Sequence, residues 1–183
     1  LVGAVFAPYV KLKYHIKITP CKELRKRQCL IIMNHQIAFD QFFVSTAVFP
    51  RPVYYIASED LFSLGWLSRL LRWAVAPIPI KKQTTDVRAV LNCIKVAKEG
   101  GTIVIAPEGN RTYSGKTEYM SASIVSLAKK LGLPIALYRL EGGYGVHPRW
   151  SDVVRRGKMT GYVSEVIEPE EYREMTDEEL FST

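Results

Sequence analysis

The amino-acid sequence predicts a single α/β domain, a sandwich in which helices flank a mostly parallel central sheet. Short apolar, β-branched runs alternate with helical patterns along the chain, which is typical of parallel strands joined by helical crossovers. The length of 183 residues suits one domain with a sizeable core. With 48% hydrophobic and 23% charged residues, the chain has the composition of a globular protein. We therefore expect residues 1–183 to form one domain.

The expected strands are short runs bounded by turn residues. They cover residues 14–19, 28–33, 53–57, 75–80, 103–106, 134–138 and 159–167. Helical patterns follow most of them, and proline, glycine or capping residues mark their ends. The expected helices cover residues 38–49 (before Pro50), 58–73, 87–97 (capped by Thr85-Asp86), 118–131 (closed by Gly132) and a charged segment from Pro169 onward. Residues 141–157 are expected to form a loop that contains glycine and tryptophan.

Two of the expected helices have distinct apolar patterns. The helix after Asp86 is amphipathic, and its apolar face is formed by Val87, Val90, Leu91, Ile94 and Ala97. Residues 61–73 combine Trp, Leu and Phe with two arginines, a pattern that resembles an interfacial membrane helix. The same pattern suits a core helix of the sandwich, which we place slightly ahead, and one helix can serve both purposes.

A histidine and an aspartate flank the end of the second expected strand. His35 follows the apolar run 29–33 closely, and Asp40 comes five residues later, where a helix is expected to begin. Residues five apart in one regular helix point about 140° away from each other. The two side chains can therefore meet only if His35 lies in the turn and Asp40 in the first helical turn. That arrangement gives a base with an orienting acid, although a purely structural hydrogen bond is the commoner role of a lone His–Asp pair.

A second polar turn, Pro107–Thr112, follows the expected strand 103–106. Gly109 allows a positive φ or a close approach of the backbone to a ligand. Arg111 offers a planar set of donors that suits phosphate or carboxylate. Because ligands bind at the carboxyl ends of parallel strands, we expect this turn and the His35 turn to share one crevice.

Four blocks, Asn34–Asp40, Ala76–Lys82, Pro107–Thr112 and Leu133–Leu137, stand in this order across residues 28–140. They resemble the sequence blocks of the glycerolipid acyltransferases, which comprise the 1-acylglycerol-3-phosphate acyltransferases and their lysophospholipid and glycerol-3-phosphate relatives. The third block, Pro-Glu-Gly-Asn-Arg-Thr, is similar to that family's Pro-Glu-Gly-Thr-Arg-Ser, and the second falls where the family has Gly-x-x-Phe-Ile-Asp-Arg. Here the second block has Lys82 in place of the arginine and Lys81 in place of the acid, so the acceptor's identity stays open.

The resemblance implies an O-acyltransferase that moves a fatty acyl group from acyl-CoA or acyl-carrier protein to a lysophospholipid hydroxyl. The first candidate reaction converts 1-acylglycerol-3-phosphate to phosphatidic acid. Glycerol-3-phosphate or another lysolipid is an alternative acceptor. A non-catalytic peripheral lipid-binding module is the alternative outside enzymes. No metal or cofactor is implied, and the spacing of cysteine and histidine gives no metal site.

The site residues follow from the matching blocks. His35 is the expected general base, which would act on the substrate's own hydroxyl because no serine or cysteine nucleophile is evident beside it, and Asp40 orients it. Glu108 is expected to bind an acceptor hydroxyl or to brace its loop, and a structural pairing with Arg111 is equally compatible with the sequence. Asn34 could order its turn by a local hydrogen bond. The expected substrate-binding residues are Asn34, Lys82, Glu108, Gly109, Arg111 and Thr112.

The net charge of +7 favours an anionic partner, such as an acidic membrane or a phosphorylated acyl carrier. No nucleic-acid recognition motif accompanies it. Three irregularly spaced cysteines favour a reducing environment. The apolar start, Leu1–Val10, is too short to span a membrane, although residues 1–12 are compatible with the tail of an N-terminal membrane-associated helix. We therefore expect the protein at the cytoplasmic face of a membrane, as a peripheral protein or anchored by such a segment.

Two other enzyme classes fit the sequence less well. Residues 109–117 resemble a phosphate-binding P-loop, but five residues separate its glycines where the Walker pattern has four. The extra residue would break the continuous set of N–H groups around a phosphate. A serine hydrolase is disfavoured because the chain has no Gly-x-Ser-x-Gly motif.

Overall fold

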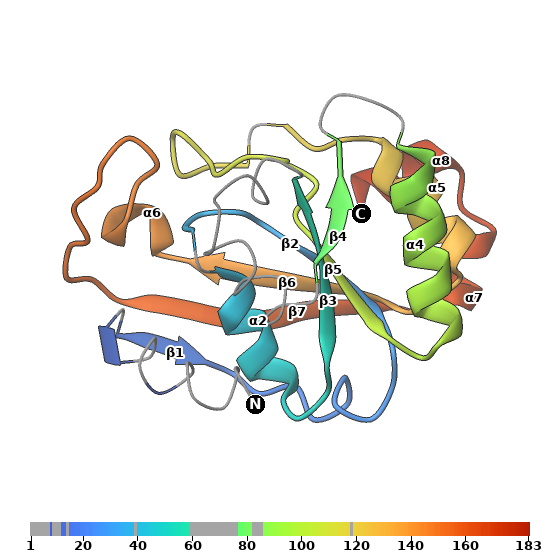
Figure 1. Cartoon of the computed structure of the whole chain (residues 1–183), viewed down its shortest axis with the longest axis horizontal. Helices are drawn as coiled ribbons and strands as arrows, with labels where there is room; N and C mark the ends of the chain where they lie inside the picture. The colour runs from blue at the N-terminus through green and yellow to red at the C-terminus, as the bar shows by residue number, and fades with distance from the viewer. Residues whose placement is uncertain are drawn as a thin grey trace.

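A sheet with the strand order β1-β7-β6-β2-β5-β3-β4 forms the centre of the computed structural model (Figure 1). The structure describes residues 8, 12–13, 15–38, 40–58, 77–81, 86–117 and 119–183. The expected helix 58–73 lies outside this range, apart from Ser58. The strands are β1 (Ile16–Ile18), β2 (Leu30–Met33), β3 (Val53–Ser58), β4 (Ile78–Ile80), β5 (Thr102–Ile105), β6 (Ile135–Glu141) and β7 (Met159–Ile167).

The predicted mostly parallel sheet is confirmed. The strands from β6 through β2, β5 and β3 to β4 pair in parallel, and β1 pairs in parallel with β7. Among the strands that the structure describes, only the β6–β7 pair is antiparallel. The loop that joins these two strands therefore leaves the carboxyl end of β6, at the same edge of the sheet as the turns that follow β2 and β5.

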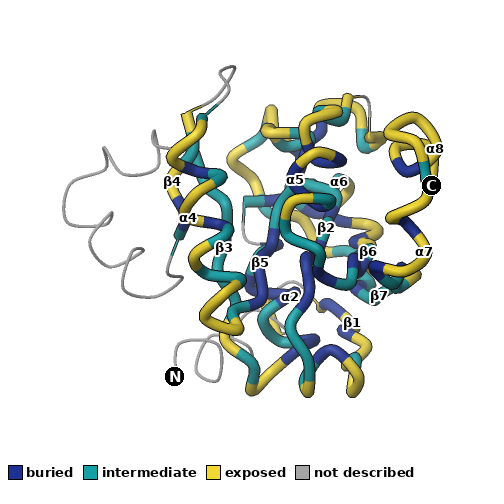
Figure 2. Tube along the Cα trace, turned by 90° about the vertical axis from the view of Figure 1, so that its right-hand side faces the viewer, coloured by how far each residue is buried: buried dark blue, intermediate teal, exposed yellow. Residues whose placement is uncertain are grey.

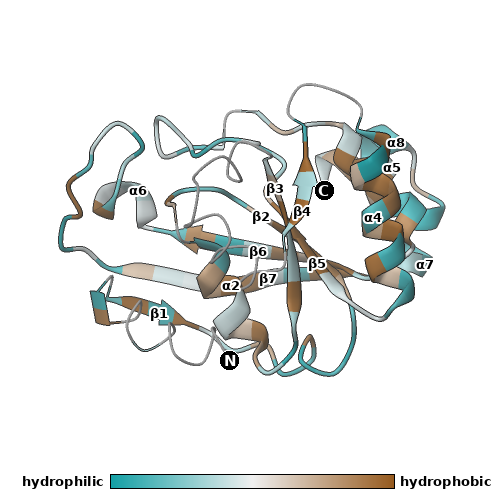
Figure 3. Cartoon of the chain, in the orientation of Figure 1, coloured by the Kyte–Doolittle hydropathy of each residue, from teal (hydrophilic) through white to brown (hydrophobic). Residues whose placement is uncertain are grey.

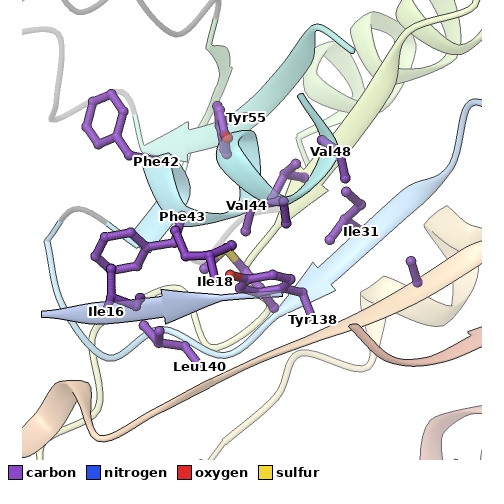
Figure 4. Close-up of a cluster of buried hydrophobic side chains, with 14 of the residues drawn as sticks. Ile16, Ile18, Ile31, Phe42, Phe43, Val44, Val48, Tyr55, Tyr138 and Leu140 are labelled. Carbon is purple, nitrogen blue, oxygen red and sulfur yellow. The ribbon is translucent and has the colours of Figure 1, made fainter. Parts of the chain in front are cut away.

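Helices cover both faces of the sheet, with α2 on one face and α4, α5, α7 and α8 on the other (Figure 1). Their bounds are α2 (Asp40–Val48), α4 (Val87–Lys98), α5 (Ser123–Leu131), α6 (Gly143–Val146), α7 (Pro169–Arg173) and α8 (Asp177–Ser182). Successive residues of β2 point to opposite faces, as strand geometry requires. Leu30 packs beneath α5, and Ile31 belongs to the cluster beneath α2 that Figure 4 shows.

The central strands are apolar and buried, whereas the loops and the outer sides of the helices are largely hydrophilic and exposed (Figures 2 and 3). Cys29 and Cys93 belong to this interior as free thiols, and burial raises the pKa of each to about 11. Cys21, the third free cysteine, is half-buried. At neutral pH the two buried cysteines therefore act as small apolar groups.

Three helix predictions need correction. The helix expected at 118–131 begins at Ser123, although its end at Gly132, with a φ of 61°, is as predicted. The charged segment after Pro169 forms two helices, because Thr176 starts a second one by accepting a hydrogen bond from the Glu179 N–H at 3.2 Å.

The third correction concerns the apolar face of α4. This helix begins after Asp86, whose side chain accepts the Ala89 N–H at 3.1 Å. Its fully buried residues are Ala89 and Cys93, whereas Val87 and Leu91 of the predicted face are exposed. Ala89 and Cys93 are small, so they let α4 pack closely on the sheet. The buried face of α4 is therefore centred on these two residues and not on Val87 and Leu91.

Tyr138 of β6 is buried in the cluster of Figure 4, where its Oη has no hydrogen-bond partner within the described part of the chain. This hydroxyl occupies the space next to Gly161 of β7 that a side chain would need. A β-carbon on Gly161 would collide with the Oη and approach the Cζ atom to 3.0 Å. Gly161 therefore makes room for the Tyr138 ring.

We expect Gly161→Ala to destabilise the fold by about 1–3 kcal/mol, since overpacking a tight core forces side chains to shift. Urea denaturation measures the change in the free energy of unfolding. Gly145→Ala is the matched control, because a β-carbon there meets no atom within 4 Å. Adding Tyr138→Phe to Gly161→Ala removes the colliding hydroxyl and should restore part of the loss. Equal stabilities for the two single variants would contradict this account of Gly161.

Candidate active site

His35 and Asp40 meet just beyond the carboxyl end of β2, as their spacing predicts. His35 lies in the turn after the strand, and Asp40 is the first residue of α2. The His35 Nδ1 lies 3.1 Å from Oδ1 and 3.0 Å from Oδ2 of Asp40. With the carboxylate at Nδ1, the proton sits on that nitrogen, which leaves Nε2 as the ring nitrogen able to accept a proton.

The carboxylate of Asp40 is buried and accepts hydrogen bonds from the backbone. It is 1% exposed, and its Oδ2 accepts the backbone N–H groups of Gln36 at 2.8 Å and Ile37 at 3.1 Å. These two N–H groups precede α2 and would otherwise lack partners in the interior. One buried acid therefore closes the turn and orients the imidazole.

The loop after β5 binds directly to the His35 turn. The His35 N–H donates to Glu108 Oε1 at 2.8 Å, and the Thr112 N–H donates to the His35 carbonyl at 2.8 Å. Because β2 and β5 are parallel neighbours, their carboxyl ends lie side by side. The two polar turns thus form one site, as expected.

Glu108 braces this contact rather than pairing with Arg111. Burial raises the pKa of Glu108, and the hydrogen bond from the His35 N–H acts in the opposite direction. Within the described chain, no ion pair joins Glu108 to Arg111, so the pairing that the sequence left open as an alternative is not found. The half-buried Arg111 side chain forms no ion pair with any carboxylate that the structure describes. It therefore remains available to an anion.

Gly109 adopts the positive φ that the sequence suggests, at 69°, and a β-carbon there would meet open space. Its own N–H donates to the Ala106 carbonyl at 3.1 Å and is therefore not available to a ligand. Lys82 lies outside the described residues. Its neighbour Lys81 lies within them, and the Lys81 N–H donates to Asp86 Oδ2 at 3.0 Å.

The side chains of Asn34 and Thr112 bond within the protein. The Asn34 amide donates to the Leu140 carbonyl and accepts the Leu140 N–H, both at 2.8 Å. It thereby joins the turn to β6, so the expected local hydrogen bond is replaced by a long-range one. Thr112 Oγ1 donates to the Lys116 carbonyl at 2.6 Å and accepts the Gly115 N–H at 3.0 Å. Both side chains shape the walls of the site.

The β6–β7 loop contributes residues that the sequence analysis missed. The Tyr144 N–H donates to Gln36 Oε1 at 3.2 Å, and Gly143 leaves room for that buried glutamine. Burial lowers the pKa of His147, and the charge of Arg111 acts in the same direction. In the sequence of this loop, only the pair Gly142-Gly143 indicates that the backbone packs closely against another residue. The pair does not indicate that this residue is Gln36.

Opposing effects set the pKa of His35. Burial alone would lower it, but the charge and hydrogen bond of Asp40 and the charge of Glu108 raise it, while Arg111 lowers it. The net result is a pKa above the ordinary value. The ring therefore stays protonated to a higher pH than a free histidine, and its unprotonated form grows as pH rises through the raised pKa.

The remaining sequence alternatives find little support in this geometry. The loop 109–117 is not followed at once by a helix, because residues 119–122 are not helical and α5 begins at Ser123. A P-loop would need that helix N-terminus beside the phosphate.

Among the residues that the structure describes, no group of three or more His, Cys, Asp or Glu could hold a metal ion. No helix in the same part of the chain is long and apolar enough to cross a membrane.

We expect Asp40→Asn to lower the pKa of His35 below the ordinary value of about 6.5, because burial remains while the neighbouring charge is lost. NMR titration of the imidazole resonances measures the shift, with His35→Asn used to assign the signal. Glu108→Gln should cause a smaller shift in the same direction, and it leaves Asp40 in place. An unchanged His35 pKa in both folded variants would show that these acids do not act on the ring.

Comparisons with known proteins agree with the family that the sequence blocks resemble. A family model described as "Acyltransferase" matches residues 15–137. The chloroplastic 1-acyl-sn-glycerol-3-phosphate acyltransferase BAT2 of Brassica napus is 23% identical over 135 residues, which cover 68% of this chain and 36% of that protein. A 1-acyl-sn-glycerol-3-phosphate acyltransferase of Borreliella burgdorferi is 28% identical over 127 residues, which cover 67% and 51% of the two chains. This chain thus spans between about a third and about half of the length of these relatives.

The fold is shared with a solved structure. The crystal structure of the 1-acyl-sn-glycerophosphate acyltransferase PlsC from Thermotoga maritima matches with a TM-score of 0.79. The match has 21% sequence identity and covers 99% of this chain and 72% of that one. Since the family model covers well over half of the chain and includes both loops of the site, this chain belongs to the acyltransferase family.

Proposed function

We propose that this protein transfers a fatty acyl group from a thioester donor to the hydroxyl of a lysophospholipid at a membrane surface. The donor is acyl-CoA or acyl-carrier protein, and 1-acylglycerol-3-phosphate is the first candidate acceptor, with phosphatidic acid as the product. The observation that carries this proposal is the His35–Asp40 pair beside the loop that contains Arg111. The names of the curated relatives and the family membership support the reaction class.

In this mechanism His35 acts directly on the acceptor. Nε2 takes the proton of the acceptor hydroxyl while its oxygen attacks the thioester carbonyl, and the new C–O bond forms. The tetrahedral intermediate then collapses, the C–S bond breaks, and the imidazolium returns the proton to the departing thiolate. Asp40 stabilises the charged imidazole between these two steps, because its carboxylate already lies 3.0 Å from Nδ1.

The intermediate's oxyanion needs donors that are free in the resting protein. The Gly109 N–H is engaged with Ala106, and the His35 N–H is engaged with Glu108. We therefore assign the oxyanion to neither of these two N–H groups. Gly109 would instead allow the close approach of the substrate, since its α-carbon faces open space.

Arg111 is the residue that we assign to the acceptor phosphate. Its guanidinium has no carboxylate partner among the described residues, and its charge already acts on His35. A phosphate held there would place the adjoining glycerol hydroxyl within reach of the base. We assign Lys82, from the second sequence block, as a further cation for the phosphate, and we assign Glu108 to bracing the loop.

We expect His35→Asn to reduce the rate of acyl transfer about a hundred- to ten-thousand-fold, the usual effect of removing a general base. The assay incubates labelled acyl-CoA with a panel of lysolipids and identifies the acylated product. His15→Asn is the matched control, because His15 is exposed just before β1 and Asn tolerates its φ of 48°. Transfer by the folded His35→Asn protein at the wild-type rate would refute the mechanism. Binding of lysolipid by wild type without any transfer would instead favour the non-catalytic lipid-binding module.

We expect Arg111→Ala to raise the KM for a phosphorylated acceptor about tenfold or more, since a charged hydrogen bond typically contributes about 1.5–3 kcal/mol. The KM for the acyl donor should change little, and so should the use of a monoacylglycerol that has no phosphate. Arg139→Ala is the control, because Arg139 is exposed on β6 and pairs with Glu141 at 3.5 Å. Equal kinetics with both acceptors would remove Arg111 from phosphate binding.

A further inference from the structure

Two loops, residues 111–117 and 147–158, lie at the carboxyl edge of the sheet (Figure 1) and contact each other through side chains. We call these two loops together the basic aromatic surface. Arg149 joins the two loops, because its Nη1 donates to the Arg111 carbonyl at 3.4 Å. The Arg149 guanidinium also lies over the Tyr113 ring, 5.5 Å from the ring centroid. The surface therefore adjoins the candidate active site through Arg111.

The aromatic side chains of this surface are fixed in place and yet remain exposed. Trp150 donates its Nε1–H to Tyr144 Oη at 3.2 Å, and the Arg155 guanidinium lies 5.3 Å from the Trp150 ring centroid. Trp150 is nevertheless 53% exposed, and Tyr113 is 59% exposed. Val153, between Trp150 and Arg155 in the chain, is 63% exposed. A hydrogen bond and cation–π contacts thus hold large apolar groups at the surface, although their exposure to water is unfavourable.

The charge of the surface is concentrated. Its 19 residues include six of the chain's 25 lysines and arginines and one of its 18 acids, Asp152. This is a local charge of +5 from about a tenth of the chain, compared with +7 for the whole chain. Glu118, the next residue in the sequence, lowers this local charge by only one unit. If the basic residues were spread evenly along the chain, these 19 residues would not carry so large a share of the net charge.

We propose that the basic aromatic surface docks on an anionic lipid bilayer. Tryptophan and tyrosine favour the boundary between headgroups and acyl chains, because one part of each side chain is apolar and another forms hydrogen bonds. Arginine and lysine beside them are attracted to lipid phosphates. Docking would place Arg111 and the mouth of the site at headgroup depth. The inference names the surface through which a lipid acceptor is reached, and in that respect it rests on the proposed function.

An acidic protein, such as an acyl-carrier protein, is the competing occupant. It would also be attracted to a charge of +5, but it would not by itself account for the exposed tryptophan, tyrosine and valine between the cations. The combination of aromatic and basic side chains next to a site for a lipid acceptor therefore favours the bilayer. The experiment distinguishes the two partners.

Cosedimentation of the full chain with vesicles tests the proposal. Vesicles of phosphatidylcholine alone are compared with vesicles that also contain phosphatidylglycerol. We expect stronger binding to the anionic vesicles, which weakens as salt is raised. Arg155→Gln/Arg156→Gln should weaken this binding about thirtyfold, or about fivefold for each lost cation. Lys95→Gln/Lys98→Gln removes the same charge from exposed positions of α4 and should bind as wild type does.

A second variant tests the aromatic part of the surface. Trp150→Ala should weaken binding several-fold at high salt, where the charge contribution is screened. Equal losses for the two double variants would show that binding depends only on net charge and would overturn the proposal. The proposal would also be overturned if Arg155→Gln/Arg156→Gln bound vesicles as wild type does but no longer bound an acyl-carrier protein. That result would assign the surface to the carrier protein. His35→Asn should bind vesicles normally, so a failure of the proposed catalysis is distinguishable from a failure of docking.

Discussion

The buried carboxylate of Asp40 is the group on which the rest of the site depends. It bonds the His35 ring and accepts the Gln36 and Ile37 N–H groups, so a single side chain closes the turn and orients the base. A buried charge is costly unless it is compensated, and here three donors and the first turn of α2 compensate it. Asp40 can therefore not be moved without also releasing the backbone that positions His35.

The parallel sheet brings the other groups to this carboxylate. β2 lies between β5 and β6, so the turn after β2 has a neighbouring loop on each side. From the β5 side, Glu108 accepts the His35 N–H. From the β6 side, the backbone of Leu140 binds Asn34, and Tyr144 binds Gln36. The His35 turn is thus fixed by hydrogen bonds on both sides, while the His35 side chain itself stays 25% exposed.

The parts of the site that the sequence could predict are local. The spacing of His35 and Asp40 is determined by one strand, one turn and one helix, and the parallel pairing of β2 with β5 brings the Glu108 loop beside them. The pairing of Asn34 with Leu140 joins residues 106 positions apart, and no local pattern indicates it. The antiparallel direction of β7 was equally hidden, although the strand itself was predicted, because its sequence suits either direction. It is this strand that returns the chain past the site and builds the loop with Tyr144, His147 and Arg149.

The charges around His35 suggest how the site would respond to an acceptor. Arg111 lowers the pKa of His35, whereas Asp40 and Glu108 raise it. If an acceptor phosphate binds at Arg111, its negative charge offsets the cation and removes the influence that weakens the base. The imidazole then becomes a stronger proton acceptor when a substrate is present. A lysine at the same position could supply the charge, but it would lack the planar donors that fix the phosphate relative to Nε2. Binding and base strength would thus be coupled through one guanidinium.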